Sequence, residues 1–137
     1  MPVRLLRRYR FSASHLYRRS AWSEAENRER FGKCSNLPGH GHNYRLWVTV
    51  EGDVDPATGF VVDLGALDRL VQEKVVERLD HQHINQTLPE FADGAQIPSG
   101  ENLVSWIRGQ LEGQLAGGTL AGLRLDEDED LGAEWSR

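Results

Sequence analysis

The sequence predicts an α+β domain in which a four-stranded antiparallel sheet carries two helices on one face, in the order ββααββ. Apolar and polar residues alternate in two long early segments and one late segment, as they do in strands with one buried face. Two intervening segments repeat their apolar residues at helical spacing, so each has a single apolar stripe. Helices of this kind can cover one face of a sheet and leave its edges free.

Each predicted strand keeps its apolar residues on one side. The first covers residues 3–15, where the odd positions include Val3, Leu5, Tyr9, Phe11, Ala13 and His15. The second begins near His42 and ends near Glu51, with Tyr44, Leu46, Val48 and Val50 alternating. A third strand is expected from Thr119 to about Glu127, and a short final strand over residues 132–135.

Turn and cap residues divide the rest of the chain. A short exposed helix is expected over residues 22–31, ending at Gly32. The turn-rich residues 52–59 and the apolar run 60–62 predict a β-hairpin. Asp63 and Ser99 are suitable N-caps for the two long helices, and Gly117 and Gly118 should end the second.

Length and composition predict one domain covering residues 1–137. The single cysteine excludes an intramolecular disulfide, and no segment is typical of a signal peptide or a membrane span, so we expect a cytoplasmic protein. The net charge of −5 argues against nucleic acid as the main partner. Six arginines nevertheless crowd the first strand and its exit: Arg4, Arg7, Arg8, Arg10, Arg18 and Arg19. They could hold an anion such as a phosphate ester, or form a solvated face or a subunit contact.

Three histidines form a predicted metal site. His40 and His42 project from the same face of the second strand, and His15 lies on the apolar side of the first. Antiparallel pairing of these strands would bring three neutral imidazoles together, which is the pattern of a catalytic zinc site with one open position. Each histidine alone is more often packed in a core, and Cys34 alone is more often a small buried hydrophobe. Their convergence favours metal chemistry.

Three further residues are candidates on weaker patterns. Asp80 directly precedes His81 at the end of the first long helix, where a carboxylate can fix the tautomer of an imidazole. A histidine at that end of a helix is also favourable for electrostatic reasons alone. Glu127 shares the parity of Leu123 and Leu125 and could point into a pocket, although spacing alone slightly favours the start of a solvated acidic run.

Several motifs in one order resemble the 6-pyruvoyl-tetrahydropterin synthase family. They are F-S-A-S-H (residues 11–15), F-G-K-C-x5-H-G-H-N-Y (31–44), D-P-x-T-G (55–59), L-D-H (79–81), G-E-N after Ser99, and the strand ending in Glu127. The resemblance spans nearly the whole chain. It implies the tunnelling fold, or T-fold, in which three subunits join their sheets into a barrel and two trimers stack as a homohexamer.

The resemblance also implies roles for individual residues. The zinc ligands fall on His15, His40 and His42, and the catalytic thiol base falls on Cys34. The proton relay falls on Asp80 and His81, and the pterin-anchoring carboxylate on Glu127. Pterin contacts fall on Ser99 and Gly100, where the family often has two threonines. The implied substrate is 7,8-dihydroneopterin triphosphate, which loses triphosphate and becomes 6-pyruvoyl-tetrahydropterin.

Two other functions are weighed against this one. The related 6-carboxy-tetrahydropterin synthases of queuosine biosynthesis use the same substrate and release acetaldehyde, but their cysteine precedes the first histidine by four residues, whereas Cys34 precedes His40 by six. A non-catalytic pterin-binding or zinc-stabilised scaffold would be favoured if Cys34 or the Asp80–His81 pair were absent. All three residues are present.

Overall fold

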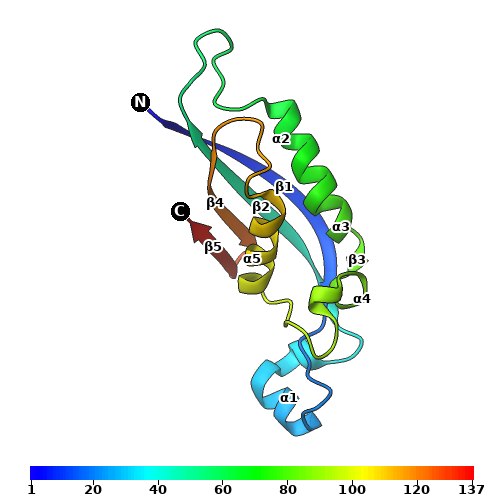
Figure 1. Cartoon of the computed structure of the whole chain (residues 1–137). Helices are drawn as coiled ribbons and strands as arrows, with labels where there is room; N and C mark the ends of the chain where they lie inside the picture. The colour runs from blue at the N-terminus through cyan, green and yellow to red at the C-terminus, as the bar shows by residue number, and fades with distance from the viewer.

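One five-stranded sheet, covered on one face by helices, organises the chain (Figure 1). The computed structural model describes all residues, Met1–Arg137. Its strands are β1 (Val3–His15), β2 (His40–Gly52), β3 (Gln82–His83), β4 (Thr119–Asp126) and β5 (Gly132–Ser136). They lie in the order β3-β1-β2-β4-β5. The α+β class and the antiparallel pairing of the four longer strands are confirmed.

The helical segments follow the predicted order. They are α1 (Glu24–Phe31), the 3₁₀ turn η1 (Gly32–Ser35), α2 (Leu64–Val71), the π-helical η2 (Gln72–Val76), α3 (Glu77–Leu79), α4 (Ile84–Thr87), the 3₁₀ turn η3 (Pro89–Phe91) and α5 (Gly100–Leu111). The elements α2, η2 and α3 form one continuous segment, which is the first predicted long helix. Figure 1 shows this segment and α5 on the same side of the sheet.

Side-chain caps begin the two long helices where the sequence predicts them. The Asp63 carboxylate accepts a hydrogen bond from the amide of Ala66 at 3.1 Å, and the Ser99 hydroxyl accepts one from the amide of Asn102 at 3.2 Å. The second helix ends earlier than expected, at Leu111 rather than at Gly117 and Gly118. The chain leaves the helix at Glu112, and Gly113 then takes a φ of 76° that favours glycine.

The core lies between the sheet and the helices. Leu46, Val48 and Val50 of β2 are fully buried, as are the helix residues Leu103 and Ile107 that share this core. Alternating residues of β2 remain partly exposed on the opposite face. The sheet therefore has one face inside the domain and one open face.

Two details of the predicted sheet are wrong. The two-residue β3 pairs parallel with β1, so the sheet has five strands and is mixed. The expected hairpin strand at residues 60–62 does not form, because β2 is already paired on both edges up to Glu51, with β1 on one side and β4 on the other. The turn itself is present, closed by hydrogen bonds between Asp55 and Gly59 and between Asp55 and Phe60.

A polar cluster joins the long helical segment to β1. Asp68 of α2 accepts hydrogen bonds from Arg7 Nε at 3.0 Å and Nη2 at 2.8 Å, and from the hydroxyl of Tyr9 at 2.7 Å. Hydrogen bonds from Arg7 and then from Tyr9 hold the pKa of Asp68 below its ordinary value, against the opposing effect of burial. This cluster joins residues far apart in the sequence.

The substitution Asp68→Asn should lower the free energy of unfolding at neutral pH by about 1 kcal/mol, because it removes a charged but partly exposed acceptor. The folded-state pKa of Asp68 is depressed, so its contribution is present above the unfolded value of about 3.9 and is lost as the pH falls through the folded value. Urea denaturation at neutral and acidic pH should show the difference between the two proteins shrinking with acidification. Glu73→Gln, which removes a charge from an exposed neighbour, is the control. An equal loss in that variant would contradict the role of the cluster.

Candidate metal centre

The pairing of β1 and β2 brings three histidines together. His15 lies directly opposite His40 in the antiparallel ladder, and His42 follows two residues later on the same face of β2. One ring nitrogen from each histidine lies within 4.8 Å of the others, and the Nε2 atoms of His15 and His40 are 3.3 Å apart. His15 is fully buried, while the other two are partly buried. The predicted histidine cluster is therefore present.

The chemical state of these rings suits a cation. Burial, the larger cause, and the neighbouring rings of His42, His40 and His83 together lower the pKa of His15 to about 3. His15 is therefore neutral at ordinary pH and offers a lone pair. The Nε2 atom of His42 is buried and has no hydrogen-bond partner within the chain, which is costly for a polar atom unless a ligand satisfies it. The neutral ring of His15 and the unpaired nitrogen of His42, converging with His40, fit a metal ion such as Zn²⁺.

A tyrosine hydroxyl orients the buried histidine. The Oη atom of Tyr44 lies 2.8 Å from Nδ1 of His15, and the tyrosine itself is buried. When Nδ1 carries the proton and donates it to this oxygen, Nε2 is left free to face the other histidines. Tyr44 lies on the same face of β2 as His42. The alternating sequence pattern therefore placed Tyr44 on the correct face, but it predicted only a core residue there.

Glu127 is buried beside the histidines. Its Oε1 atom lies 3.5 Å from Nε2 of His15 and 3.6 Å from Nε2 of His42, and accepts a hydrogen bond from the hydroxyl of Tyr17 at 3.2 Å. The interpretation that spacing alone favoured, a solvated acidic run, is wrong for this residue, although Asp128, Glu129 and Asp130 are exposed. The neutral state of His15 means that its contact with Glu127 is not an ion pair in the chain alone.

Cys34 lies at the rim of the same cluster. It is carried by η1, and its Sγ atom is 3.9 Å from Nε2 of His40. Burial raises the pKa of the thiol, and the negative charge of Glu127 raises it further. A cation held by the three histidines would act in the opposite direction and favour the thiolate.

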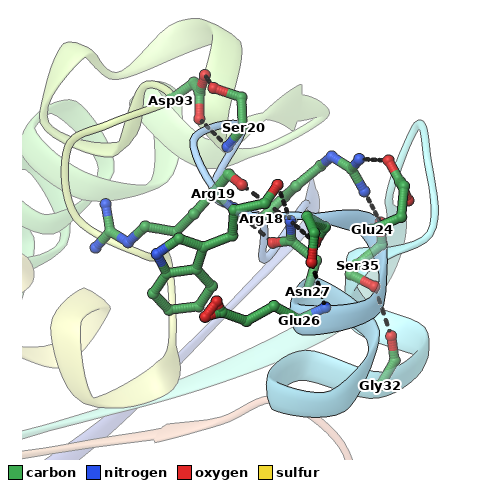
Figure 2. A network of polar contacts seen from close by, with 11 residues as sticks. Arg18, Arg19, Ser20, Glu24, Glu26, Asn27, Gly32, Ser35 and Asp93 are labelled. Atoms are coloured by element: carbon green, nitrogen blue, oxygen red, sulfur yellow. Dashed lines mark hydrogen bonds and ion pairs between the residues drawn. The ribbon is translucent and has the colours of Figure 1, made fainter.

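A buried asparagine holds the segment that leads to Cys34. The side chain of Asn27 accepts from the amide of Arg19 at 2.8 Å and donates to the carbonyls of Arg19, Trp22 and Ser23 (Figure 2). Arg18 donates to the carbonyl of Ser35 at 3.3 Å. The amide of Tyr17 also donates to the carbonyl of Cys34 at 2.9 Å. The loop between β1 and α1 is thus tied to the turn that presents the thiol.

Asp80 and His81 lie apart from Cys34. Asp80 Oδ2 is 3.0 Å from Nδ1 of His81, and Asp80 Oδ1 accepts a hydrogen bond from the amide of Ser12 at 2.9 Å. The Ser12 bond first, and His81 second, hold the pKa of Asp80 below its ordinary value. His81 has a side chain that is 82% exposed, and it lines a hollow of about 430 Å³ together with His42. No contact within one chain joins His81 to the thiol.

The remaining predicted positions do not touch the histidines. The Ser99 hydroxyl is engaged in capping α5, and Gly100 begins that helix. A side chain at Gly100 would meet Ala133 at 3.4 Å. The site residues that sequence reasoning missed are Tyr17, Asn27 and Tyr44, since their roles depend on hydroxyl and amide contacts that periodicity does not reveal.

Comparisons with known proteins agree on one family. A family model described as 6-pyruvoyl tetrahydropterin synthase matches residues 4–137. The 6-pyruvoyl tetrahydrobiopterin synthase of Homo sapiens is 40% identical over 124 residues, which cover 90% of this chain and 84% of that protein. The solved structure of Caenorhabditis elegans 6-pyruvoyl tetrahydropterin synthase is 30% identical, with a TM-score of 0.90 over 100% of this chain and 96% of the other. A 6-carboxy-5,6,7,8-tetrahydropterin synthase of Synechocystis is 34% identical over 59% of this chain and 60% of that protein.

Replacing Tyr44 by phenylalanine tests the orientation of His15. The ring and its stacking on Phe11, at a centroid distance of 4.9 Å, are retained, while the hydrogen bond to Nδ1 is lost. We expect the affinity for Zn²⁺ to fall about tenfold to a hundredfold, measured by competition with a chromophoric chelator. Tyr9→Phe removes a hydroxyl remote from the histidines and should leave the affinity unchanged. Equal affinities for Tyr44→Phe and the wild type would refute the orienting role.

Proposed function

The chain belongs to the 6-pyruvoyl tetrahydropterin synthase family, and we propose that it converts 7,8-dihydroneopterin triphosphate to 6-pyruvoyl-tetrahydropterin with elimination of triphosphate. The observation that carries this proposal is the convergence of His15, His40 and His42 with the thiol of Cys34. Three converging imidazole nitrogens and a nearby thiol suit a metal-assisted proton abstraction. The likeness to human and nematode synthases supports the same reaction class.

The proposed metal is Zn²⁺, held by the three histidines. When bound, it would polarise the oxygens of the substrate side chain and stabilise the charge that develops when a neighbouring carbon loses its proton. Tyr44 would keep the lone pair of His15 directed at the ion. The oxidation state of zinc does not change, which suits a rearrangement that needs no external electron donor or acceptor.

Cys34 is the proposed base. Its position on η1, fixed by the contacts of Tyr17 and Arg18 with the backbone of residues 34 and 35, places the sulfur beside His40 at the rim of the site. The thiol would take the proton from the substrate carbon. The resemblance assigns Glu127 to anchoring the pterin ring by paired hydrogen bonds. Its place beside the histidines also permits a contact with the side-chain end of the substrate.

The proposed assembly is a T-fold hexamer made of two stacked trimers. Its physical support is the pair of open sheet edges, since β3 covers only Ala13 and Ser14 on the outer edge of β1, and β5 has no partner beyond β4. No helix of the chain is long and apolar enough to cross a membrane. The cytoplasmic location expected from the sequence stays a prediction.

The assembly also offers a place for Asp80 and His81. The pair is proposed to return protons to the intermediates, yet His81 faces solvent and does not touch Cys34 of its own chain. We therefore propose that each relay serves the thiol of a neighbouring subunit. Ser99 and Gly100 stay proposed pterin contacts, with the backbone at Gly100 replacing a side chain.

Product analysis tests the reaction. Zinc-loaded protein should convert 7,8-dihydroneopterin triphosphate to a 6-pyruvoyl product detected by mass spectrometry, and Cys34→Ala should lose most turnover while still binding metal. A 6-carboxy product with acetaldehyde would instead assign the related synthase activity, which the partial likeness to the Synechocystis protein makes the second candidate. Metal and pterin binding without turnover would favour the scaffold function.

Subunit mixing tests the shared site. Cys34→Ala and His81→Ala should each be inactive as homo-oligomers. Mixed oligomers, formed by refolding or coexpression, should regain activity because some sites combine a thiol from one subunit with a relay from another. Mixing each variant with itself is the control. If activity stays absent in mixed oligomers of verified composition, the relay and the thiol act within one chain.

A further inference from the structure

Two arginines face each other on the open side of the sheet. Arg10 of β1 and Arg45 of β2 are direct partners in the antiparallel ladder, and their parity places them opposite the face that carries His15 and His42. Neither side chain makes a hydrogen bond, an ion pair or a stacking contact within the chain, whose residues are all described. Like charges directly across two strands destabilise a sheet. An unpaired cationic couple therefore needs an explanation outside the chain.

The surrounding surface supplies a bounded site. The two arginines line a hollow of about 340 Å³ whose other polar side chains are Ser12, Asn43 and Asp80. The hydroxyl of Ser12 donates to Oδ1 of Asn43 at 2.6 Å. The amide nitrogen of Asn43 has no acceptor in the chain, so it can donate to a ligand. Arg8 lies two residues before Arg10 on the same face, with its guanidinium 5.7 Å from the ring centre of Trp47. The site is rich in donors and positive charge.

The nearby carboxylates are engaged by other groups. Asp80 is bound by the amide of Ser12 and by His81. Asp126 lies opposite Arg45 on β4, but its Oδ1 accepts from Nε of Arg124 at 3.0 Å. Neither carboxylate forms an ion pair with Arg10 or Arg45. The charge of the arginine couple is therefore available to an external anion.

We propose that Arg10 and Arg45 form a binding site for a polyphosphate anion. The planar guanidinium presents paired donors that match adjacent phosphate oxygens, and two opposed guanidiniums can grip successive phosphates. A small anion fits better than nucleic acid, because the chain has a net charge of −5 and the cationic groups occupy one hollow rather than a long track. In the proposed barrel the helices lie on the outside, so the open face of the sheet, with Arg10 and Arg45, would line the interior. That the anion is the triphosphate released by the reaction rests on the proposed function. Binding of a polyphosphate as such does not.

The stability of variants distinguishes a ligand site from a structural one. If the arginines serve the fold, removing either should lower the melting temperature. If they serve an anion, Arg10→Gln should leave the melting temperature unchanged or raise it in anion-free buffer, because it relieves cross-strand repulsion. The same variant should lose the rise that sodium tripolyphosphate causes in the wild type. A lower melting temperature with an undiminished tripolyphosphate effect would overturn the proposal.

Calorimetric titration measures the binding directly. Sodium tripolyphosphate should bind the purified protein, and Arg10→Gln or Arg45→Gln should each weaken binding about tenfold or more. Arg28→Gln removes the same charge from an exposed residue of α1 and should have little effect. Tripolyphosphate also chelates metals, so His42→Ala, which removes a proposed zinc ligand, must retain the binding. Because that variant is tested without turnover, the result does not depend on the proposed reaction.

Three outcomes would reject the site. Equal weakening by Arg28→Gln would mean that binding reflects net charge alone. Loss of binding in His42→Ala would place the anion at the metal centre instead. No heat and no change in melting temperature for the wild type at millimolar tripolyphosphate would show that Arg10 and Arg45 do not form a polyphosphate site.

Discussion

The register between β1 and β2 is the constraint on which the site depends. The ladder runs without a shift from Val3 opposite Gly52 to His15 opposite His40. Because side chains alternate between the faces of a strand, a slip of one residue would send His40 and His42 to the open face and leave His15 behind. The slip would also expose Leu46 and Val48, so the same burial that stabilises the sheet holds the three histidines in place.

Glu127 reaches the site through a second strand pair that tolerates an irregularity. The pairing of β2 with β4 shifts between Thr49 and Val50, yet beyond this shift Leu125 still lies opposite Leu46. Glu127 follows Leu125 by two residues, so its side chain lies on the same buried face. The bulge lies at the far end of the strand from the histidines, where an extra residue does not disturb them.

The sequence was sufficient where a long periodic pattern decided the structure. The strands, the two long helices and the shared face of the histidines all follow from alternation or helical spacing over many residues. It was insufficient for β3, which has two residues and forms because the backbone of Ser12 bonds Asp80 and His81. The missing strand at residues 60–62 depends on both edges of β2 being occupied, which is a property of the assembled sheet.

The burial of Glu127 shows the same limit in chemical terms. A run of acidic residues ordinarily remains in water because burying a carboxylate costs free energy unless it is paired. Here the hydroxyl of Tyr17 donates to it, and Tyr17 belongs to a segment more than a hundred residues earlier in the chain. Only the folded structure brings the donor to the acceptor, so spacing could not distinguish this residue from its exposed neighbours.

The two-residue period that builds the candidate metal centre also explains how one pair of strands can support a second kind of chemistry. On the helix-covered face, burial keeps His15 neutral and favours a cation. On the open face, the guanidinium groups of Arg10 and Arg45 have no partner in the chain, which favours an anion. A metal at the histidines and a polyphosphate at the arginines would therefore lie on opposite faces of the sheet, and the anion would not compete for the metal site. The register of β1 on β2 thus decides which side chains meet on each face, and with them the sign of the ligand that each proposed site would take.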